Sequence, residues 1–253
     1  MRAAALGLVL GAAFLGATAA LGADAAARAA VQAFVARLGE VEIHDLVVEQ
    51  RVTRYHPDGL HPAVHGEQKL LMKLPGRQRL EEVIDGRREV KLLVDGRTWI
   101  RRADGQTFEA PPSPQDRSAS DFMTPSKRSA DDLLAGWRAL GVRDDVSDTV
   151  RVGGRAITVI GARAGDRESP AVWLDPERGV VRFIGRETLP KGPTLVDRAF
   201  SEHRPLRGGF QFPYRQEAFI GGRLVLVVNV RSAVANVDLP DALFDPGALK
   251  RER

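Results

Sequence analysis

The segment QRLEEVIDGRREVKLLVDGRTWIRRADGQTFE, residues 78–109, decides the fold class. Three Asp-Gly pairs interrupt it, at 85–86, 95–96 and 104–105, and short runs rich in Val, Leu, Ile, Trp and Phe lie between them. An Asp-Gly pair readily adopts the positive φ angles that a two-residue hairpin turn needs. The segment therefore predicts a meander of antiparallel strands. The predicted strands are 78–84, 89–94, 97–102 and 106–109.

The same pattern continues on both sides of this segment. Short apolar runs bounded by turn residues predict further strands at 41–55, 66–74, 148–152, 155–161, 170–174, 179–189, 195–204, 210–219 and 223–235. Apolar residues at helical spacing predict two helices, 25–38 and 129–140. We therefore expect an α+β fold that is mainly β, built on one large antiparallel sheet.

The N-terminus has the order of an export signal. Arg2 gives a positive start, residues 3–20 carry no charge, and small residues that fit a cleavage site follow at 17–19 and 23–25. This order predicts a secretory signal peptide over residues 1–25. An uncleaved membrane anchor is the alternative interpretation of the same apolar run.

The remaining residues, 26–253, have the length of one large domain. A proline-rich stretch at 110–127 interrupts the strand pattern and predicts a long loop. The chain has no cysteine, so it forms no disulfide and offers no residue for the acyl anchor of a lipoprotein. With no later long apolar run, we expect an exported protein without a tight membrane anchor.

The charges and motifs argue against nucleic-acid binding and against catalysis. The net charge is only +4, and the basic residues are scattered among acids. No sequence motif of a serine hydrolase, zinc protease, nucleotide-binding loop or dithiol site is present. The acidic pair at 81–82 stands on a predicted strand, where neighbouring side chains point to opposite faces and cannot act together. The pair at 131–132 stands in the first turn of a predicted helix, where negative charge is stabilising. We expect a non-enzymatic protein without catalytic residues or a cofactor.

Three of the five histidines lie close together, at 56, 61 and 65. Imidazole is a common metal ligand. However, no carboxylate or fourth histidine keeps a zinc-motif spacing with them, and the prolines and Gly59 indicate a turn. We therefore predict an exposed connection between two strands and assign no metal site.

Five segments carry a pattern that belongs to a known family. They are VVEQRV (47–52), the run 66–81 around Leu74-Pro75-Gly76, LVDGRTW (93–99), WLDPE (173–177) and VDLPDALFDP (237–246). In this order and spacing they resemble the LolA-like family of periplasmic lipoprotein carriers and outer-membrane lipoprotein-sorting proteins. The resemblance covers roughly residues 26 to 246.

The resemblance implies both a fold and an activity. The fold is a strongly curved antiparallel sheet, an incomplete barrel, with helices covering its concave mouth. The activity is the binding of lipoprotein acyl chains or lipid in the cavity, in the periplasm, with an inner-membrane transporter as a further partner. One position departs from the family pattern, because Leu74 stands where the carriers often have an arginine before the proline.

Apolar residues on the predicted strands and on the second helix are the candidates for the lining of such a cavity. They are Leu70, Met72, Leu74, Trp99, Trp137, Trp173, Phe212 and Tyr214. The alternative is that these side chains form a filled core. The leading function is a carrier that shields acyl chains for outer-membrane sorting, and the alternative function is a lipid-sensing or protein-binding accessory module of an envelope transporter.

Overall fold

The computed structural model describes residues 15–56, 58–111, 128–189 and 192–252. In these residues one antiparallel sheet of 13 strands runs in the order β6-β5-β4-β3-β2-β1-β13-β12-β11-β10-β9-β8-β7. Neighbouring strands are consecutive in the chain except where β1 pairs with β13. The sheet is not closed, and β6 and β7 form its two edges. The expected mainly-β, open antiparallel architecture is confirmed.

The strands match most of the predicted ranges. On one side of the sheet they are β1 (Asp45–Arg54), β2 (Val64–Lys73), β3 (Arg77–Ile84), β4 (Arg87–Val94), β5 (Arg97–Arg101) and β6 (Thr107–Ala110). On the other side they are β7 (Ser147–Val152), β8 (Arg155–Ile160), β9 (Ala171–Asp175), β10 (Gly179–Leu189), β11 (Gly192–Pro205), β12 (Gln211–Ile220) and β13 (Arg223–Ala235).

The hairpin turns have the backbone geometry that their sequences predict. Asp85 and Gly86 have φ angles of 49° and 73°, and Asp95 and Gly96 have 50° and 74°. Two residues with positive φ match the twist of the strands on either side. The Asp-Gly pairs therefore set the register of β3 on β4 and of β4 on β5.

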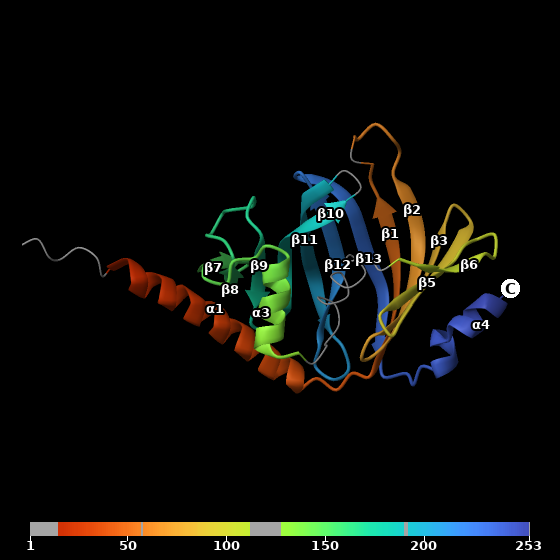
Figure 1. The fold of residues 1–253 in the computed structure, drawn as a ribbon, viewed down its shortest axis with the longest axis horizontal. Coiled ribbons are helices and arrows are strands. Elements are labelled where there is room, and N and C mark those ends of the chain that lie inside the picture. The colour runs from red at the N-terminus through yellow and green to blue at the C-terminus, as the bar shows by residue number, and fades with distance from the viewer. Residues whose placement is uncertain (1–14, 57, 112–127, 190–191, 253) are drawn as a thin grey trace, which may run out of the picture.

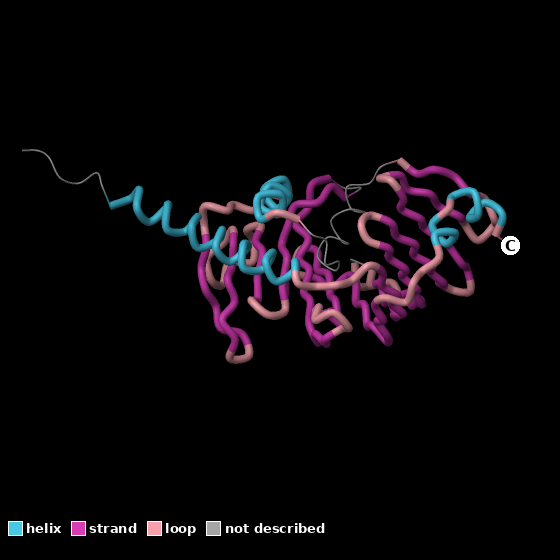
Figure 2. The backbone as a smooth tube through the Cα atoms, turned by 90° about the horizontal axis from the view of Figure 1, so that it is seen from below, coloured by secondary structure: helices cyan, strands magenta, loops and turns pink. Residues whose placement is uncertain are grey.

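The sheet bends into a trough. Two helices, α1 (Leu15–Gly39) and α3 (Ala130–Ala139), pack against one side of it at the β7–β10 end, and the N-terminal part of α1 extends beyond the sheet (Figures 1 and 2). We call the side of the sheet on which these helices pack the inner face. Buried residues of α1, among them Val31, pack with Trp137 of α3 and with Phe183 of β10. Phe34 of α1 reaches Gly179, where a Cβ atom would lie 2.9 Å from its ring, so glycine permits this close approach.

The C-terminal segment covers the opposite side, the outer face. After β13 the chain forms a 3-10 helix, η1 (Asp241–Phe244), and a short helix, α4 (Pro246–Arg251), which lies beside β3–β6 (Figure 1). Phe244 and Leu249 pack there against Val90 and Leu92 of β4. Asp45, which is 2% exposed, holds the start of this segment. Its carboxylate accepts hydrogen bonds from the N–H groups of Val237 and Leu239 at 2.8 and 2.9 Å.

Three features differ from the sequence prediction or lie outside the description. Helix α1 begins at Leu15 rather than at residue 25, because the alanine-rich residues before 25 have high helix propensity. The helix α4 was not predicted. The proline-rich stretch 110–127 lies outside the described residues from 112 onward. No helix of the described residues is long and apolar enough to cross a bilayer.

Candidate functional site on the inner face

The centre of the inner face is apolar because consecutive strands bring aliphatic residues into line. Val48 of β1 lies opposite Leu70 of β2, and Leu46 lies opposite Met72. Side chains alternate between faces along a strand, so these residues share one face. The buried inner cluster consists of Leu38, Val41, Ile43, Leu46, Val48, Leu70, Met72, Leu206, Phe210, Phe212, Val230 and Ala235. Phe34 of α1 packs against this cluster and also against the cluster of Val31, Trp137 and Phe183 beneath the helices. Both clusters therefore lie on the inner face.

Five of the eight candidate residues meet at this cluster. Leu70, Met72 and Phe212 are buried members, and Leu74 and Tyr214 pack against it as partly buried residues. Phe212 and Tyr214 meet edge to face, with ring centroids 6.4 Å apart. The Leu74 N–H donates to the carbonyl oxygen of His44 at 2.7 Å. Leu74, which occupies the position of the family arginine, therefore belongs to an apolar surface.

Trp137 lies on the inner face but in a different place. It is 4% exposed and packs under α1 with Leu134 and Phe183. The helix α3 that carries it starts with a capping box, in which Ser129 and Asp132 exchange hydrogen bonds. Hydrogen bonds from Ser129 lower the pKa of Asp132. Arg28 of α1 and Asp131 of α3 form an ion pair at 2.5 Å that joins the two helices.

The other two tryptophans lie on the outer face, away from the remaining candidates. Trp99 lies opposite Leu92 and packs with the cluster that Phe244 and Leu249 cover. Trp173 packs with Val159 and its neighbours in a second outer cluster. The sequence showed that each residue stands on a strand, but it did not show which face the residue takes, because the face depends on the register with neighbouring strands.

The tryptophan rings on the outer face contact cations. The Nζ atom of Lys250 lies 4.9 Å from the centroid of the Trp99 ring, and the guanidinium of Arg167 lies 4.7 Å from that of Trp173. Cations at these distances are attracted to the ring face. The structure therefore places both tryptophans under charged side chains of the outer surface.

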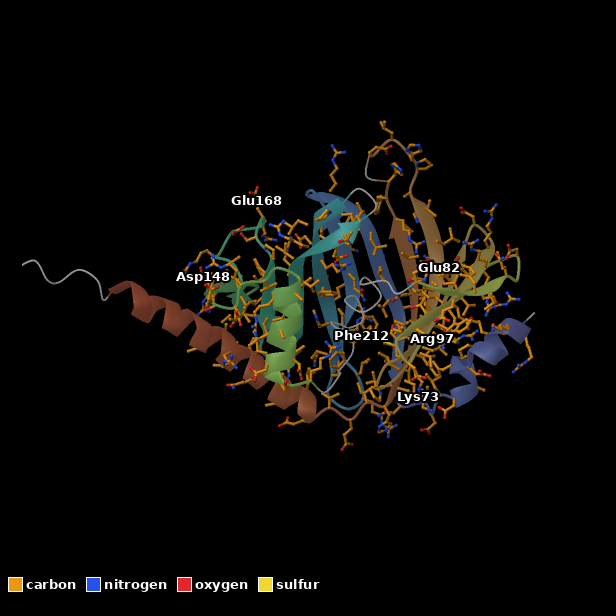
Figure 3. All side chains as sticks on the ribbon, viewed as in Figure 1. Lys73, Glu82, Arg97, Asp148, Glu168 and Phe212 are labelled. Atoms are coloured by element: carbon orange, nitrogen blue, oxygen red, sulfur yellow. The ribbon has the colours of Figure 1, made fainter. Side chains whose placement is uncertain are left out.

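One end of the inner face is polar. Arg54 of β1 donates to Glu82 of β3 at 2.8 Å, Gln68 of β2 donates to Glu82 at 2.9 Å, and Gln50 donates to Gln68 at 2.7 Å. These four residues form a continuous row across the three strands. Figure 3 shows that Glu82 is nearer the β1–β2 loop than Phe212 is. The inner face thus changes from apolar to polar along the strands.

A hollow of about 420 Å³ opens beside this polar row. Glu82, Ile84 and Glu89 line it from the inner face, together with Asp85 and Arg87 of the hairpin. Because its lining is mostly charged, this hollow suits a hydrated or polar group better than a hydrocarbon chain.

A second polar group lies on β10–β12. Arg198 of β11 donates to Glu187 of β10 in a two-bond ion pair, with Nη2 3.0 Å from Oε2, and the Glu187 side chain is 5% exposed. The Nε2 atom of Gln216 on β12 is buried and has no hydrogen-bond partner among the described residues. Sequence reasoning missed these inner-face polar residues, because period-2 alternation groups them only when the strand register is known.

Comparison of the sequence with family models and with curated protein sequences finds no match. Comparison with solved structures finds several over nearly their whole length. A DUF1329 family protein from Desulfovibrio piger has a TM-score of 0.57 at 15% identity and covers 87% of this chain and 98% of its own. A putative outer membrane lipoprotein-sorting protein domain from Vibrio parahaemolyticus has a TM-score of 0.54 at 12% identity, covering 89% of this chain and 100% of its own.

A LolA superfamily protein from Nitrosomonas europaea has a TM-score of 0.53 at 13% identity, covering 85% of this chain and 97% of its own. The chain has the LolA-like fold. The resemblance that the five sequence segments indicated is therefore confirmed at the level of the fold. In this LolA-like sheet the inner face, which combines an apolar centre with one polar end, is the candidate functional site.

Proposed function

We propose that the protein is a non-enzymatic periplasmic carrier that binds acyl chains of a lipoprotein or lipid on the inner face of its sheet. The observation that carries the proposal is the apolar inner face of an unclosed sheet, on which the partly buried Leu74, Leu80 and Tyr214 border a buried apolar cluster. Helices α1 and α3 pack mainly at the β7–β10 end, and α1 reaches the inner cluster with Phe34 and Leu38 near its C-terminal end. The inner face of β3–β5 lies beyond the main contacts of these two helices.

The energetics suit reversible binding. Each buried methylene contributes about 0.8 kcal/mol, so about ten methylenes contribute about 8 kcal/mol. Ordering the chain and the protein opposes this gain. The net corresponds to a dissociation constant of about 1 μM or weaker. A carrier needs such an affinity, because it must also release its cargo.

The polar row supports an orientation for the cargo. Arg54, Gln68 and Glu82 lie on the same face as Leu70, beyond the apolar cluster. An amphipathic molecule can place its chain on the cluster and its head group beside the row, where hydrogen-bonding groups meet it. The two solved structures described as lipoprotein-sorting and LolA superfamily proteins share the fold and support the choice of cargo class.

The first experiment asks whether the purified protein holds and takes up acyl chains. The chain is isolated from an envelope fraction, its bound lipid is extracted and identified by mass spectrometry, and the stripped protein is titrated with a fluorescent fatty acid. The proposal expects co-purified lipid and saturable uptake. A protein that carries no lipid and shows no saturable uptake contradicts it.

A transfer assay separates a carrier from the alternative, an accessory module of an envelope transporter. Donor vesicles with a fluorescent lipid are mixed with unlabelled acceptor vesicles, with and without the protein. A carrier accelerates transfer in proportion to its concentration. A module that senses lipid or binds a protein partner binds the probe or captures its partner from envelope extract without accelerating transfer.

A further inference from the structure

The loop between β1 and β2 gathers two imidazoles around one carboxylate. The Nδ1 atom of His56 lies 2.7 Å from one oxygen of Asp58, and the Nδ1 atom of His61 lies 2.8 Å from the other. The two imidazole rings lie with their centroids 4.4 Å apart. One ligand atom from each of the three residues lies within 4.8 Å of the other two. All three residues are exposed, so a solute can reach them.

The loop is held on both strands that flank it. Arg54 pairs with Val64 at the end of the β1–β2 ladder, and the Tyr55 N–H donates to the carbonyl oxygen of Val225 in β13 at 2.9 Å. Within the loop the Gly59 N–H donates to the carbonyl of His56 at 3.0 Å. These bonds bring the two ends of the loop to fixed positions and so limit the spread of the imidazoles.

The carboxylate at the centre is fixed by its own backbone. The Leu60 N–H donates to Asp58 Oδ1 at 2.9 Å, in a turn that Gly59 permits with a φ angle of 70°. The turn therefore holds the Asp58 carboxylate between the two imidazoles, with one oxygen directed at each ring.

His65 does not belong to this group. Its Nδ1 atom pairs with the hydroxyl of Thr53 across the ladder at 3.1 Å. The sequence places three histidines close together, with no carboxylate at a zinc-motif spacing from them. In the folded loop Asp58 replaces the third histidine, because the turn at Gly59 folds the chain back on itself.

The ligand chemistry selects a class of metal. Two imidazoles and one carboxylate suit divalent first-row transition metals such as Zn²⁺, and without thiolates they do not suit softer ions. Zn²⁺ binds such ligands at about 2.1 Å, which places ligand atoms about 3.4 Å apart in a tetrahedron. The observed separations of the ligand atoms, from 2.7 Å to at most 4.8 Å, lie on either side of this value. Water would take the remaining position of the tetrahedron.

We propose that His56, Asp58 and His61 form a binding site for a divalent transition metal, Zn²⁺ being the best match. The site stands at the tip of the hairpin that also carries the polar end of the inner face (Figure 1). It is independent of the proposed carrier function, because none of its three ligands belongs to the inner-face cluster.

The test uses the full chain without a histidine tag, freed of metal with a chelator. Isothermal titration with Zn²⁺ and the visible absorption of Co²⁺ report stoichiometry, affinity and coordination. We expect one metal per chain. The variants H61A and D58N should bind at least about tenfold more weakly, because losing a direct ligand costs no less than losing an outer-shell partner.

The variant H65A is the matched control, since His65 lies on the same hairpin outside the ligand set. It should keep the affinity of the unaltered chain. Thermal unfolding without metal verifies that all variants fold. The proposal is overturned if the unaltered chain binds Zn²⁺ more weakly than about 1 mM, or if H61A and D58N bind as tightly as H65A.

Discussion

Leu70 and Leu80 lie directly opposite each other across β2 and β3, and both side chains lie on the inner face of the sheet. Val48 continues the row on β1. Leu80 is only partly buried at the margin of the cluster, so it adds apolar surface without being essential to the core. This row extends the apolar surface toward β4, the side that α1 and α3 do not cover.

The first prediction concerns Asp45, which joins the sheet to the C-terminal segment. Replacing it by alanine leaves the buried N–H group of Leu239 and the partly buried N–H group of Val237 without their carboxylate partner. The free energy of unfolding should fall by about 2–3 kcal/mol, the cost of unsatisfied buried hydrogen-bonding groups. Urea denaturation measures the change.

The exposed neighbour Asp238 provides the control for Asp45. The variant D238N should change the free energy of unfolding by less than about 0.5 kcal/mol, as surface substitutions generally do. If D45A and D238N are equally stable, Asp45 does not anchor the segment.

The second prediction tests the orientation of the cargo and rests on the proposed function. Glu82 accepts hydrogen bonds from Arg54 and Gln68. In E82Q the Arg54 guanidinium loses its counter-charge and becomes available to a fatty-acid carboxylate. We expect E82Q to bind a fatty acid up to about fivefold more tightly, which corresponds to about 1 kcal/mol for a partly exposed pair.

The methyl ester of the same fatty acid provides the control, because it has no charge for Arg54 to attract. Its affinity should be the same for E82Q and for the unaltered protein. Equal changes for acid and ester, or none for either, would place the head group elsewhere on the protein while leaving chain binding itself intact.

The third prediction concerns the pH dependence of stability. Burial, helped by the nearby Arg178, lowers the pKa of His203 from 6.5 to about 4. Between these values the unfolded chain binds a proton that the folded chain does not, so the free energy of unfolding falls as the pH drops through this window. The contribution of His203 is fully present above about pH 6.5, and its loss amounts to no more than about 3 kcal/mol.

The variant H203Q removes this titration. Urea denaturation at about pH 7 and about pH 4.5 should show a smaller loss of stability on acidification for H203Q than for the unaltered protein. Identical losses would mean that other groups account for the acid sensitivity and that His203 does not.

The strand boundaries could be predicted from the sequence because the turn residues that set them are adjacent in the chain. Asp-Gly pairs at 85–86 and 95–96 demanded hairpins, and the capping box at Ser129 fixed the start of α3. Local chemistry did not reveal the helix α4. With six residues, it forms because Asp245 caps it and Leu249 is buried against β4, and the second of these contacts is tertiary.

The candidate site was predicted only in part, for a related reason. Leu70 and Met72, and likewise Phe212 and Tyr214, stand two residues apart on one predicted strand, so the alternation of side chains alone places each pair on one face. It could not show that Trp99 points outward, since that follows from its pairing with Leu92 and from the C-terminal segment that covers them. The grouping of His56, Asp58 and His61 could likewise not be predicted from the sequence, because their proximity depends on the backbone conformation of the loop.

The most direct test of the central claim compares two substitutions on one strand, β3. Leu80 is partly buried on the inner face, and Val83, which is 42% exposed, points to the outer face. Titration with a fluorescent fatty acid should show about tenfold weaker binding for L80N, the loss expected when about 1.4 kcal/mol of apolar contact is removed, while V83N binds like the unaltered protein. Equal affinity of the two variants would contradict the claim that acyl chains bind on the inner face.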